Sequence, residues 1–238
     1  MYNGKRILAV VPARGGSKGI PGKNLARVGG IPLVARVGAI IRELPEIDRA
    51  IVSTDSLEIA NVAEASGISA PFMRPPELSG DRIGDWDVLN HALSECERMD
   101  NCRYDIVLML QPTCPLRQAK HVRRVLEKLV TEGWDATWTV SETDSKGHPL
   151  KQLIVAPNGG VDYYDQAGKA IVARQQLTPV YHRNGAAYAF TRECIFGQKT
   201  TFGKKSAVVI ISDPMANIDT KEDLEFADYI LERETRGS

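Results

Sequence analysis

The sequence has no excess of either charge, no paired-cysteine pattern and no long apolar run. Among its 238 residues, 30 are Lys or Arg and 30 are Asp or Glu. This balance argues against bulk binding to nucleic acid or to a membrane surface, so any anionic ligand must be held by a local cluster of basic residues. None of the four cysteines lies in a CxxC pair or beside a His that would complete a zinc pattern. We therefore expect free thiols in a reducing compartment and predict a cytoplasmic location.

A membrane-spanning segment is also missing. No apolar stretch approaches the roughly 20 residues that a spanning helix needs. The first apolar run, within MYNGKRILAVVPAR, ends at Pro12 and not at a small-residue cleavage site. This predicts a first β-strand and not a signal peptide.

Strand and helix patterns alternate from residue 6 to about residue 140. This alternation predicts an α/β fold with a doubly wound, mostly parallel, Rossmann-like sheet, in which ligands bind beyond the carboxyl ends of the strands. The expected strands are 6–12, 50–55, 70–73 and 105–110, and the expected helices are 31–44, 57–66, 86–99 and 121–131.

The pattern changes between about residues 145 and 182. Short alternating pieces flank an Asn158-Gly159-Gly160 turn, which predicts a β-rich insertion. Strands at 187–191 and 207–211 are expected to rejoin the main sheet, and 221–233 to form a last helix. We therefore predict one domain over residues 1–238 with an insertion at about 145–182.

A glycine-rich, basic loop with the sequence VPARGGSKGIPGKNL follows the first predicted strand. Its glycines let the backbone approach a ligand and point several N–H groups at one spot, as in phosphate-binding nests. Arg14, Lys18 and Lys23 offset much of the charge of a nucleoside triphosphate. The P-loop spacing GxxxxGK[ST] is not met. The alternative is a flexible surface loop with solvated charges, but this density of glycines and cations directly after a buried strand favours phosphate binding.

The PARGGSKGIPGKNL stretch closely resembles the signature of the CMP–acylneuraminate (CMP–sialic acid) synthetases, a cytidylyltransferase family. The resemblance spans nearly the whole chain and implies transfer of CMP from CTP to the anomeric hydroxyl of a nonulosonic (sialic-type) acid, with release of pyrophosphate. Further matches follow in the family's order: VSTDS at 52–56, RPPELSGD at 74–81, LQPTCPLR at 110–117, HPLK at 148–151, RQQL at 174–177, RNGAAY at 183–188 and NIDTKED at 217–223.

The resemblance also implies a CTP site. Arg14 and Lys23 would stabilise charge as pyrophosphate departs, with Asp219 as a third catalytic residue. Asp85 stands where relatives carry a small hydroxyl residue; it would accept a hydrogen bond from the cytosine amino group, or alternatively cap the helix at 86–99. The implied CTP-binding residues are Arg14, Gly15, Gly16, Ser17, Lys18, Lys23, Asn24, Arg74 and Asp85.

The acid sugar is expected to bind through five residues. The cations among them suit its carboxylate, although without the resemblance Lys151 and Arg174 would be solvated charges on a hairpin. Arg117 is equally well explained as a structural anchor, and His182 stands where relatives often carry Arg. The implied sugar-binding residues are Gln111, Lys151, Arg174, Asn184 and Tyr188.

The cofactor implied by the resemblance is Mg²⁺ or Mn²⁺. Relatives show Asp-Ile-Asp-Thr near the C-terminus, whereas this chain has Asn217-Ile218-Asp219-Thr220. Asp219 remains a hard-oxygen ligand, while Asn217 offers only a neutral carbonyl. Thr220 and Asp223 are expected to form a capping box for the last helix, which is compatible with a metal at Asp219. The family's insertion docks on a second subunit, so a homodimer is expected.

Three alternatives remain from the sequence. The acid could be legionaminic acid, pseudaminic acid, Kdn or Kdo, although the first loop disfavours Kdo. A catalytically weak or inactive CTP-binding paralogue is supported by Asn217 alone. A purely structural protein leaves the glycine-rich basic loop unexplained.

Overall fold

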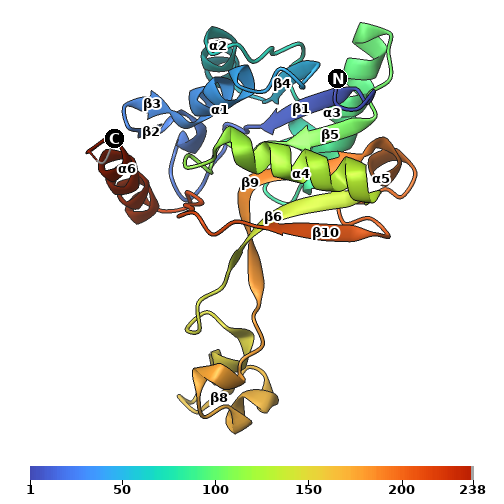
Figure 1. Ribbon diagram of the computed structural model, residues 1–238. Helices are drawn as coiled ribbons and strands as arrows, with labels where there is room; N and C mark the ends of the chain where they lie inside the picture. Colours follow the sequence, from blue (N-terminus) through green and yellow to red (C-terminus); the bar gives the residue numbers. More distant parts are fainter. Residues whose placement is uncertain (237–238) are drawn as a thin grey trace.

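A six-stranded, mostly parallel sheet with helices on both faces forms the body of the protein in the computed structural model, which describes residues 1–236 (Figure 1). Its order is β10-β6-β9-β5-β1-β4, and only β9 runs antiparallel to its neighbours. This confirms the predicted α/β architecture. The strands are β1 (Ile7–Pro12), β4 (Arg49–Ser53), β5 (Ile106–Met109), β6 (Ala136–Glu142), β9 (Tyr181–Thr191) and β10 (Ser206–Ile210).

The first strand shows why its run is continuously apolar. Successive side chains point to opposite faces of a strand, and both faces of β1 are covered. Ile7 and Val11 pack in the core beneath α1, α2 and α4, whereas Leu8 and Val10 pack beneath α3 and α5.

Within residues 1–236 we find no helix with the length and apolar surface of a membrane span. The helices are α1 (Leu33–Arg42), α2 (Leu57–Ala65), α3 (Asp85–Asp100), α4 (Ala119–Glu132), α5 (Arg192–Phe196) and α6 (Lys221–Arg236).

Two predicted elements near the first two strands are corrected by the structure. Residues 70–73 form no strand; only a single bridge joins Ile51 to Ser69. Pro71 has no N–H to offer a ladder, and the chain leaves the sheet to carry Arg74 towards the pocket. The helix expected from residue 31 begins at Leu33, because the two preceding residues pair as β3 (Ile31–Pro32) with β2 (Arg27–Val28).

The long strand β6 was not predicted, and β9 was predicted only over residues 187–191. They pair antiparallel with a register shift between Trp138 and Val140, and both continue beyond the sheet. In Figure 1 they carry a small lobe that hangs away from the body. We call residues 143–180 the arm.

The arm is less β-rich than predicted. It holds one hairpin, β7 (Leu153–Val155) with β8 (Val161–Tyr163), whose turn contains Gly159 at φ +83°. The rest is short 3₁₀ turns, η3 (Pro149–Lys151), η4 (Gln166–Ala170) and η5 (Arg174–Gln176). The hairpin was predicted from the Asn-Gly-Gly turn, whereas the 3₁₀ turns carry no periodic pattern that would reveal them.

Candidate active site

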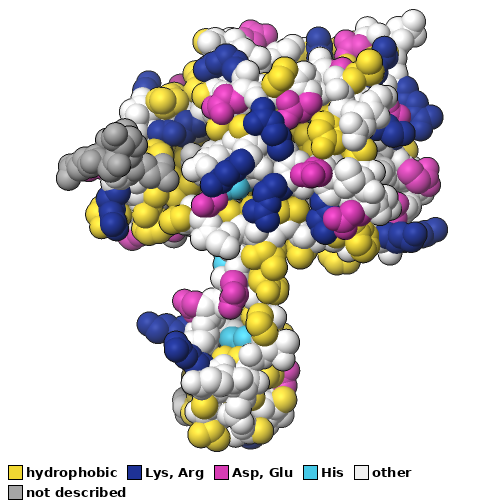
Figure 2. Space-filling model, in the orientation of Figure 1, with side chains coloured by type: hydrophobic (Ala, Val, Ile, Leu, Met, Phe, Trp, Pro, Cys, Tyr) yellow, Lys and Arg dark blue, Asp and Glu magenta, His cyan; other side chains and the backbone are white. Residues whose placement is uncertain are grey.

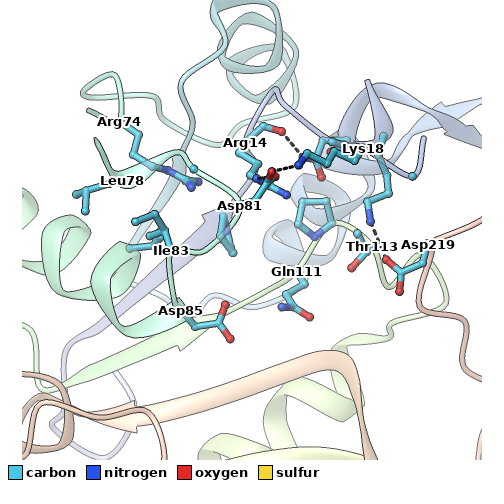
Figure 3. A pocket seen from close by; sticks show the side chains of 18 residues that line it. Arg14, Lys18, Arg74, Leu78, Asp81, Ile83, Asp85, Gln111, Thr113 and Asp219 are labelled. Carbon is cyan, nitrogen blue, oxygen red and sulfur yellow. Dashed lines mark hydrogen bonds and ion pairs between the residues drawn. The ribbon is translucent and has the colours of Figure 1, made fainter. Parts of the chain in front are cut away.

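A polar pocket of about 470 Å³ lies beyond the carboxyl ends of β1 and β5. This is the place where ligands bind in open α/β sheets. Figure 3 shows cations gathered at one end of it and Asp85 with Gln111 at the other. The lining residues are Pro12, Arg14, Ser17, Lys18, Gly19, Lys23, Asn24, Arg74, Leu78, Gly80, Asp81, Ile83, Asp85, Val88, Gln111, Pro112, Thr113 and Asp219.

The glycine-rich loop is folded around fixed points. The N–H of Gly15 donates to Asp55 Oδ1 at 2.7 Å, and the buried Asn24 donates to the carbonyl of Arg14 at 2.9 Å. A Cβ on Gly19 would lie 2.7 Å from the carbonyl oxygen of Asp219, so only glycine allows this close approach. The N–H of Gly15 is therefore engaged by Asp55, and Gly15 does not line the pocket. Asn24 acts as a brace of the loop.

All three predicted cations of the loop line the pocket, and each has an acidic partner. Lys23 Nζ lies 2.8 Å from Asp219 Oδ1. Arg14 Nη1 lies 2.6 Å from Asp81 Oδ1, and Lys18 Nζ pairs with the other oxygen of the same carboxylate (Figure 3). Hydrogen bonds from Lys18 and Arg14 hold the pKa of Asp81 below its usual value. An anionic ligand can therefore bind these three cations if it displaces the carboxylates of Asp81 and Asp219.

Asp81 also lines the pocket, although sequence reasoning gave it no individual role. It lies within the RPPELSGD motif, but one acidic residue in a loop carries no signal of a distant partner. Its contacts with Arg14 span 67 positions of sequence. Only the folded chain brings these groups together.

Arg74 is held at the end of β4. Its guanidinium donates to Ser53 Oγ at 3.0 Å and to the carbonyl of Ser53, and only 5% of the residue is exposed. Burial lowers the pKa of Arg74 to about 10, which leaves it positive at neutral pH. Together with the apolar Leu78 and Ile83 it lies on the side of the pocket away from Lys18 (Figure 3).

Asp85 is the first residue of α3 and not its cap. The N-cap is Gly84, whose N–H donates to the Asp87 carboxylate at 3.2 Å. The capping alternative for Asp85 is therefore wrong, and its carboxylate faces the pocket (Figure 3). Burial raises the pKa of Asp85, while Arg183, whose Nη1 lies 3.6 Å away, opposes that shift.

Gln111 and Thr113 line the pocket at the end of β5, but Arg117 does not. Arg117 is 4% exposed and donates to the carbonyls of Gln111, Gly185 and Ala186. Arg117 is therefore the structural anchor that ties the end of β5 to β9.

Two predicted sugar-binding residues lie in the core. Asn184 and Tyr188 are each 2% exposed. The Asn184 side chain accepts from Thr139 Oγ1 at 2.7 Å, and the Tyr188 hydroxyl accepts from the N–H of Gly185 at 2.7 Å. The structure does not bring either into the pocket lining, because their polar groups are used within the sheet.

Lys151 and Arg174 lie on the arm, and neither lines the pocket formed by the same chain. His182 is also engaged outside it, with Nδ1 lying 2.9 Å from Thr143 Oγ1. Of the five residues predicted for the sugar, only Gln111 lines the pocket of its own chain.

The segment before α6 carries the predicted capping box. Asp223 accepts from the N–H groups of Thr220 and Asp219 at 2.8 and 2.9 Å, while its own N–H donates to Thr220 Oγ1 at 3.3 Å. The N–H of Ile218 donates to the carbonyl of Thr113 at 2.8 Å. The predicted capping box is therefore confirmed, and together with this tie it fixes the backbone on both sides of Asp219.

The acidic groups set limits on a metal site. Across residues 1–236, no group of three or more His, Cys, Asp or Glu side chains is placed to hold a metal ion. Asp219 lines the pocket, whereas Asn217 does not. Mg²⁺ is commonly held by one or two carboxylates together with substrate phosphates and water. The residues present therefore fit a magnesium ion that arrives with a polyphosphate, and not one bound by the protein alone.

Known proteins resemble this chain both in sequence and in fold. A family model described as Cytidylyltransferase matches residues 8–234. CMP-N,N'-diacetyllegionaminic acid synthase of Legionella pneumophila is 29% identical, covering 93% of this chain and 94% of that protein. N-acylneuraminate cytidylyltransferase of Streptococcus agalactiae is 31% identical, covering 91% of this chain and 51% of that protein, so this chain spans about half of its length. A solved CMP:2-keto-3-deoxy-manno-octonic acid synthetase complexed with CTP has a TM-score of 0.68 at 18% identity, covering 96% of this chain and 99% of that one, and shares the fold.

Proposed function

This chain belongs to the cytidylyltransferase family, and we propose that it joins CMP from CTP to the anomeric hydroxyl of a nonulosonic (sialic-type) acid and releases pyrophosphate. The pocket carries the proposal, because its two ends differ in chemistry. Arg14 and Lys18 lie at one end and Asp85 at the other (Figure 3), and Lys23 lines the pocket beside Asp219. A nucleoside triphosphate has this polarity, with its negative charge at the end opposite the base.

The reaction assigns a task to each end. The sugar hydroxyl oxygen bonds to the α-phosphorus while the bond to the β-phosphate oxygen breaks, and pyrophosphate leaves with the electron pair. Arg14 and Lys23 stabilise the charge that gathers on this leaving group. Lys18 neutralises the remaining phosphate charge. The Asp85 carboxylate accepts a hydrogen bond from the cytosine amino group, and Arg74 completes that end of the pocket.

Magnesium, or manganese, is part of the proposal. Asp219 would hold the ion together with the phosphates, and Asn217 would add at most a neutral carbonyl. Bound there, the ion would lower the cost of gathering negative charge between the phosphates. The proton of the sugar hydroxyl passes to Asp219 or to water as the new bond forms.

Restoring a carboxylate at position 217 tests this metal assignment. We expect Asn217→Asp to lower the Mg²⁺ concentration for half-maximal turnover by about fivefold, the effect of one added charge near a cation in a solvated site. Titrating Mg²⁺ at saturating CTP measures it. Asn61→Asp, on the exposed face of α2, adds the same charge far from the pocket and should leave the titration unchanged. An unchanged titration for Asn217→Asp contradicts a metal beside this residue.

The arm supports a homodimer. It stands away from the body (Figure 2), and its surface exposes apolar side chains that its own chain does not cover. Lys151 and Arg174 lie on the same arm, outside the pocket of their own chain. Docking on a second copy would bury the apolar surface and bring these cations near the partner's pocket, where the acid carboxylate needs a positive partner. The exposed apolar residues are Leu153, Ile154, Val155, Val161, Tyr164 and Val172.

A charge on the arm should break this dimer. Val155 is 72% exposed, so Val155→Glu costs little in the single chain but places an unpaired charge in the proposed interface. Sedimentation velocity should show a dimer for the natural protein and a shift to the single-chain mass for the variant. Leu57→Glu, at an equally exposed apolar position on α2, should remain dimeric. A single-chain mass for the natural protein would overturn the proposal.

The function is tested by pyrophosphate release from CTP and Mg²⁺. N-acetylneuraminic, legionaminic, pseudaminic and Kdn acids are offered separately. Release with one acid establishes the reaction and names the acid. If CTP binds but no acid gives pyrophosphate release, in the natural protein and in Asn217→Asp alike, the chain is a CTP-binding paralogue instead.

We also propose a cytoplasmic location, supported by four free cysteines among the described residues.

A further inference from the structure

The carboxylate of Asp81 occupies the cationic end of the pocket. It pairs with Arg14 through one oxygen, at 2.6 Å, and with Lys18 through the other. The two cations thus share one carboxylate, as they would share the oxygens of a phosphate. Both oxygens are engaged, and the side chain remains 39% exposed.

Apart from the two ion pairs of Asp81, the segment around this residue is held mainly by local backbone hydrogen bonds. It connects η2 (Pro76–Leu78) to α3. Around Asp81 the backbone bonds are local turns, such as Ser79 N–H to Pro76 at 3.0 Å and Ile83 N–H to Gly80 at 3.3 Å. Within residues 1–236, the Asp81 carboxylate pairs with the two pocket cations, Arg14 and Lys18. The side chain can therefore leave the cations without unfolding an element.

We propose that Asp81 is an intramolecular competitor for the polyphosphate subsite, a positioning residue that holds Arg14 and Lys18 in the absence of nucleotide and is displaced by phosphate groups. The inference rests on the proposed function for the identity of the polyphosphate. When CTP binds, its phosphates replace the Asp81 carboxylate as the ion-pair partner of Arg14 and of Lys18. Because these two ion pairs must first be broken, Asp81 weakens the affinity for CTP. When pyrophosphate leaves, the same carboxylate recovers its partners and favours product release.

Removing the charge tests this exchange. For Asp81→Asn we expect CTP, pyrophosphate and tripolyphosphate each to bind about three- to tenfold more tightly than to the natural protein, the range set by two solvent-exposed ion pairs. Isothermal titration calorimetry, with and without Mg²⁺, measures it. Asp81→Glu keeps the competing carboxylate and should bind like the natural protein. Glu77→Gln removes an equal charge from the exposed turn before Asp81 and should change binding by less than about twofold.

Steady-state kinetics adds a readout that a merely structural role would not move. In Asp81→Asn the KM for CTP and the inhibition constant of pyrophosphate should fall together, and Asp81→Glu should restore both. Unchanged or weaker binding by Asp81→Asn would overturn the inference. Weakening only with Mg²⁺ present would overturn it too, since it would make Asp81 a metal ligand.

The outcome is separable from that of the proposed function. Tighter tripolyphosphate binding in Asp81→Asn, with no pyrophosphate release from any acid, would support the competitor and refute the reaction. Normal turnover of the natural protein, with no change of affinity in the variant, would support the reaction and refute the competitor.

Discussion

Replacing Lys23 by Ala should lower the turnover number about 10²–10³-fold, the usual cost of removing one group that stabilises developing charge. Lys23 reaches the pocket from the glycine-rich loop, and its side chain is only 17% exposed. Its Nζ lies 2.8 Å from Asp219, so one cation serves both the departing pyrophosphate and the proposed metal ligand. Because the charge on pyrophosphate develops in the transition state, turnover should fall more than the affinity for the acid sugar.

Steady-state pyrophosphate release, with CTP and the acid varied in turn, measures this split. Lys128→Ala removes an equal charge from the surface of α4, where Lys128 pairs with Glu132, and should leave turnover within about twofold. Folding is a small concern, since Asp219 is 67% exposed and remains solvated without its partner. An unchanged turnover number in Lys23→Ala would contradict the proposal that Lys23 stabilises the charge on the departing pyrophosphate.

Replacing Arg117 by Met should lower the free energy of unfolding by about 3–5 kcal/mol. The side chain is buried and donates to three carbonyls, those of Gln111, Gly185 and Ala186. Met keeps an unbranched apolar stem, but it is shorter and offers no donor, so the three buried acceptors lose their partner. These acceptors lie at the end of β5 and on β9, and therefore the pocket wall at Gln111 should loosen as well.

Urea unfolding of the variant and the natural protein gives the difference directly. Arg124→Met, on the exposed side of α4, should change the free energy by no more than about 1 kcal/mol, although Arg124 also donates to a carbonyl, that of Ile210, at 3.2 Å. If Arg117→Met does not fold, Arg117→Lys keeps one charged donor and should show a smaller, measurable loss. A loss below about 1 kcal/mol for Arg117→Met would contradict the anchoring role.

Local patterns were sufficient wherever a residue's role depends on its neighbours in sequence. The continuous apolar run of β1 predicts a strand covered on both faces, and the structure confirms it. Glycines and cations directly after that strand predict an anion-binding pocket, and Arg14, Lys18 and Lys23 all line one. Thr220 and Asp223 form the capping box that their spacing predicts.

The sequence was less informative about which side chains the fold brings into the pocket. Asn184 and Tyr188 lie on a strand that the sequence did not reveal at its full length, and pairing on both sides of β9 buries them. Strand periodicity tells which residues share a face, but not which face meets a ligand. The sequence left two roles for Asp85, a pocket residue or the N-cap of the helix, because a shift of the helix start by one residue decides between them. The structure places the N-cap at Gly84.

The sequence by itself determined the α/β class, the glycine-rich loop with its three cations and the local cap beside Asp219, because backbone preference, apolar periodicity and cap spacing act over a few residues. The tertiary structure alone decided that Asp81 reaches Arg14 across 67 positions and that Asp219 reaches Lys23 across 196. It also placed Lys151 and Arg174 on an arm outside their own pocket. Such pairings depend on how the chain crosses from strand to strand, and a charge carries no local signal of the partner that it will meet.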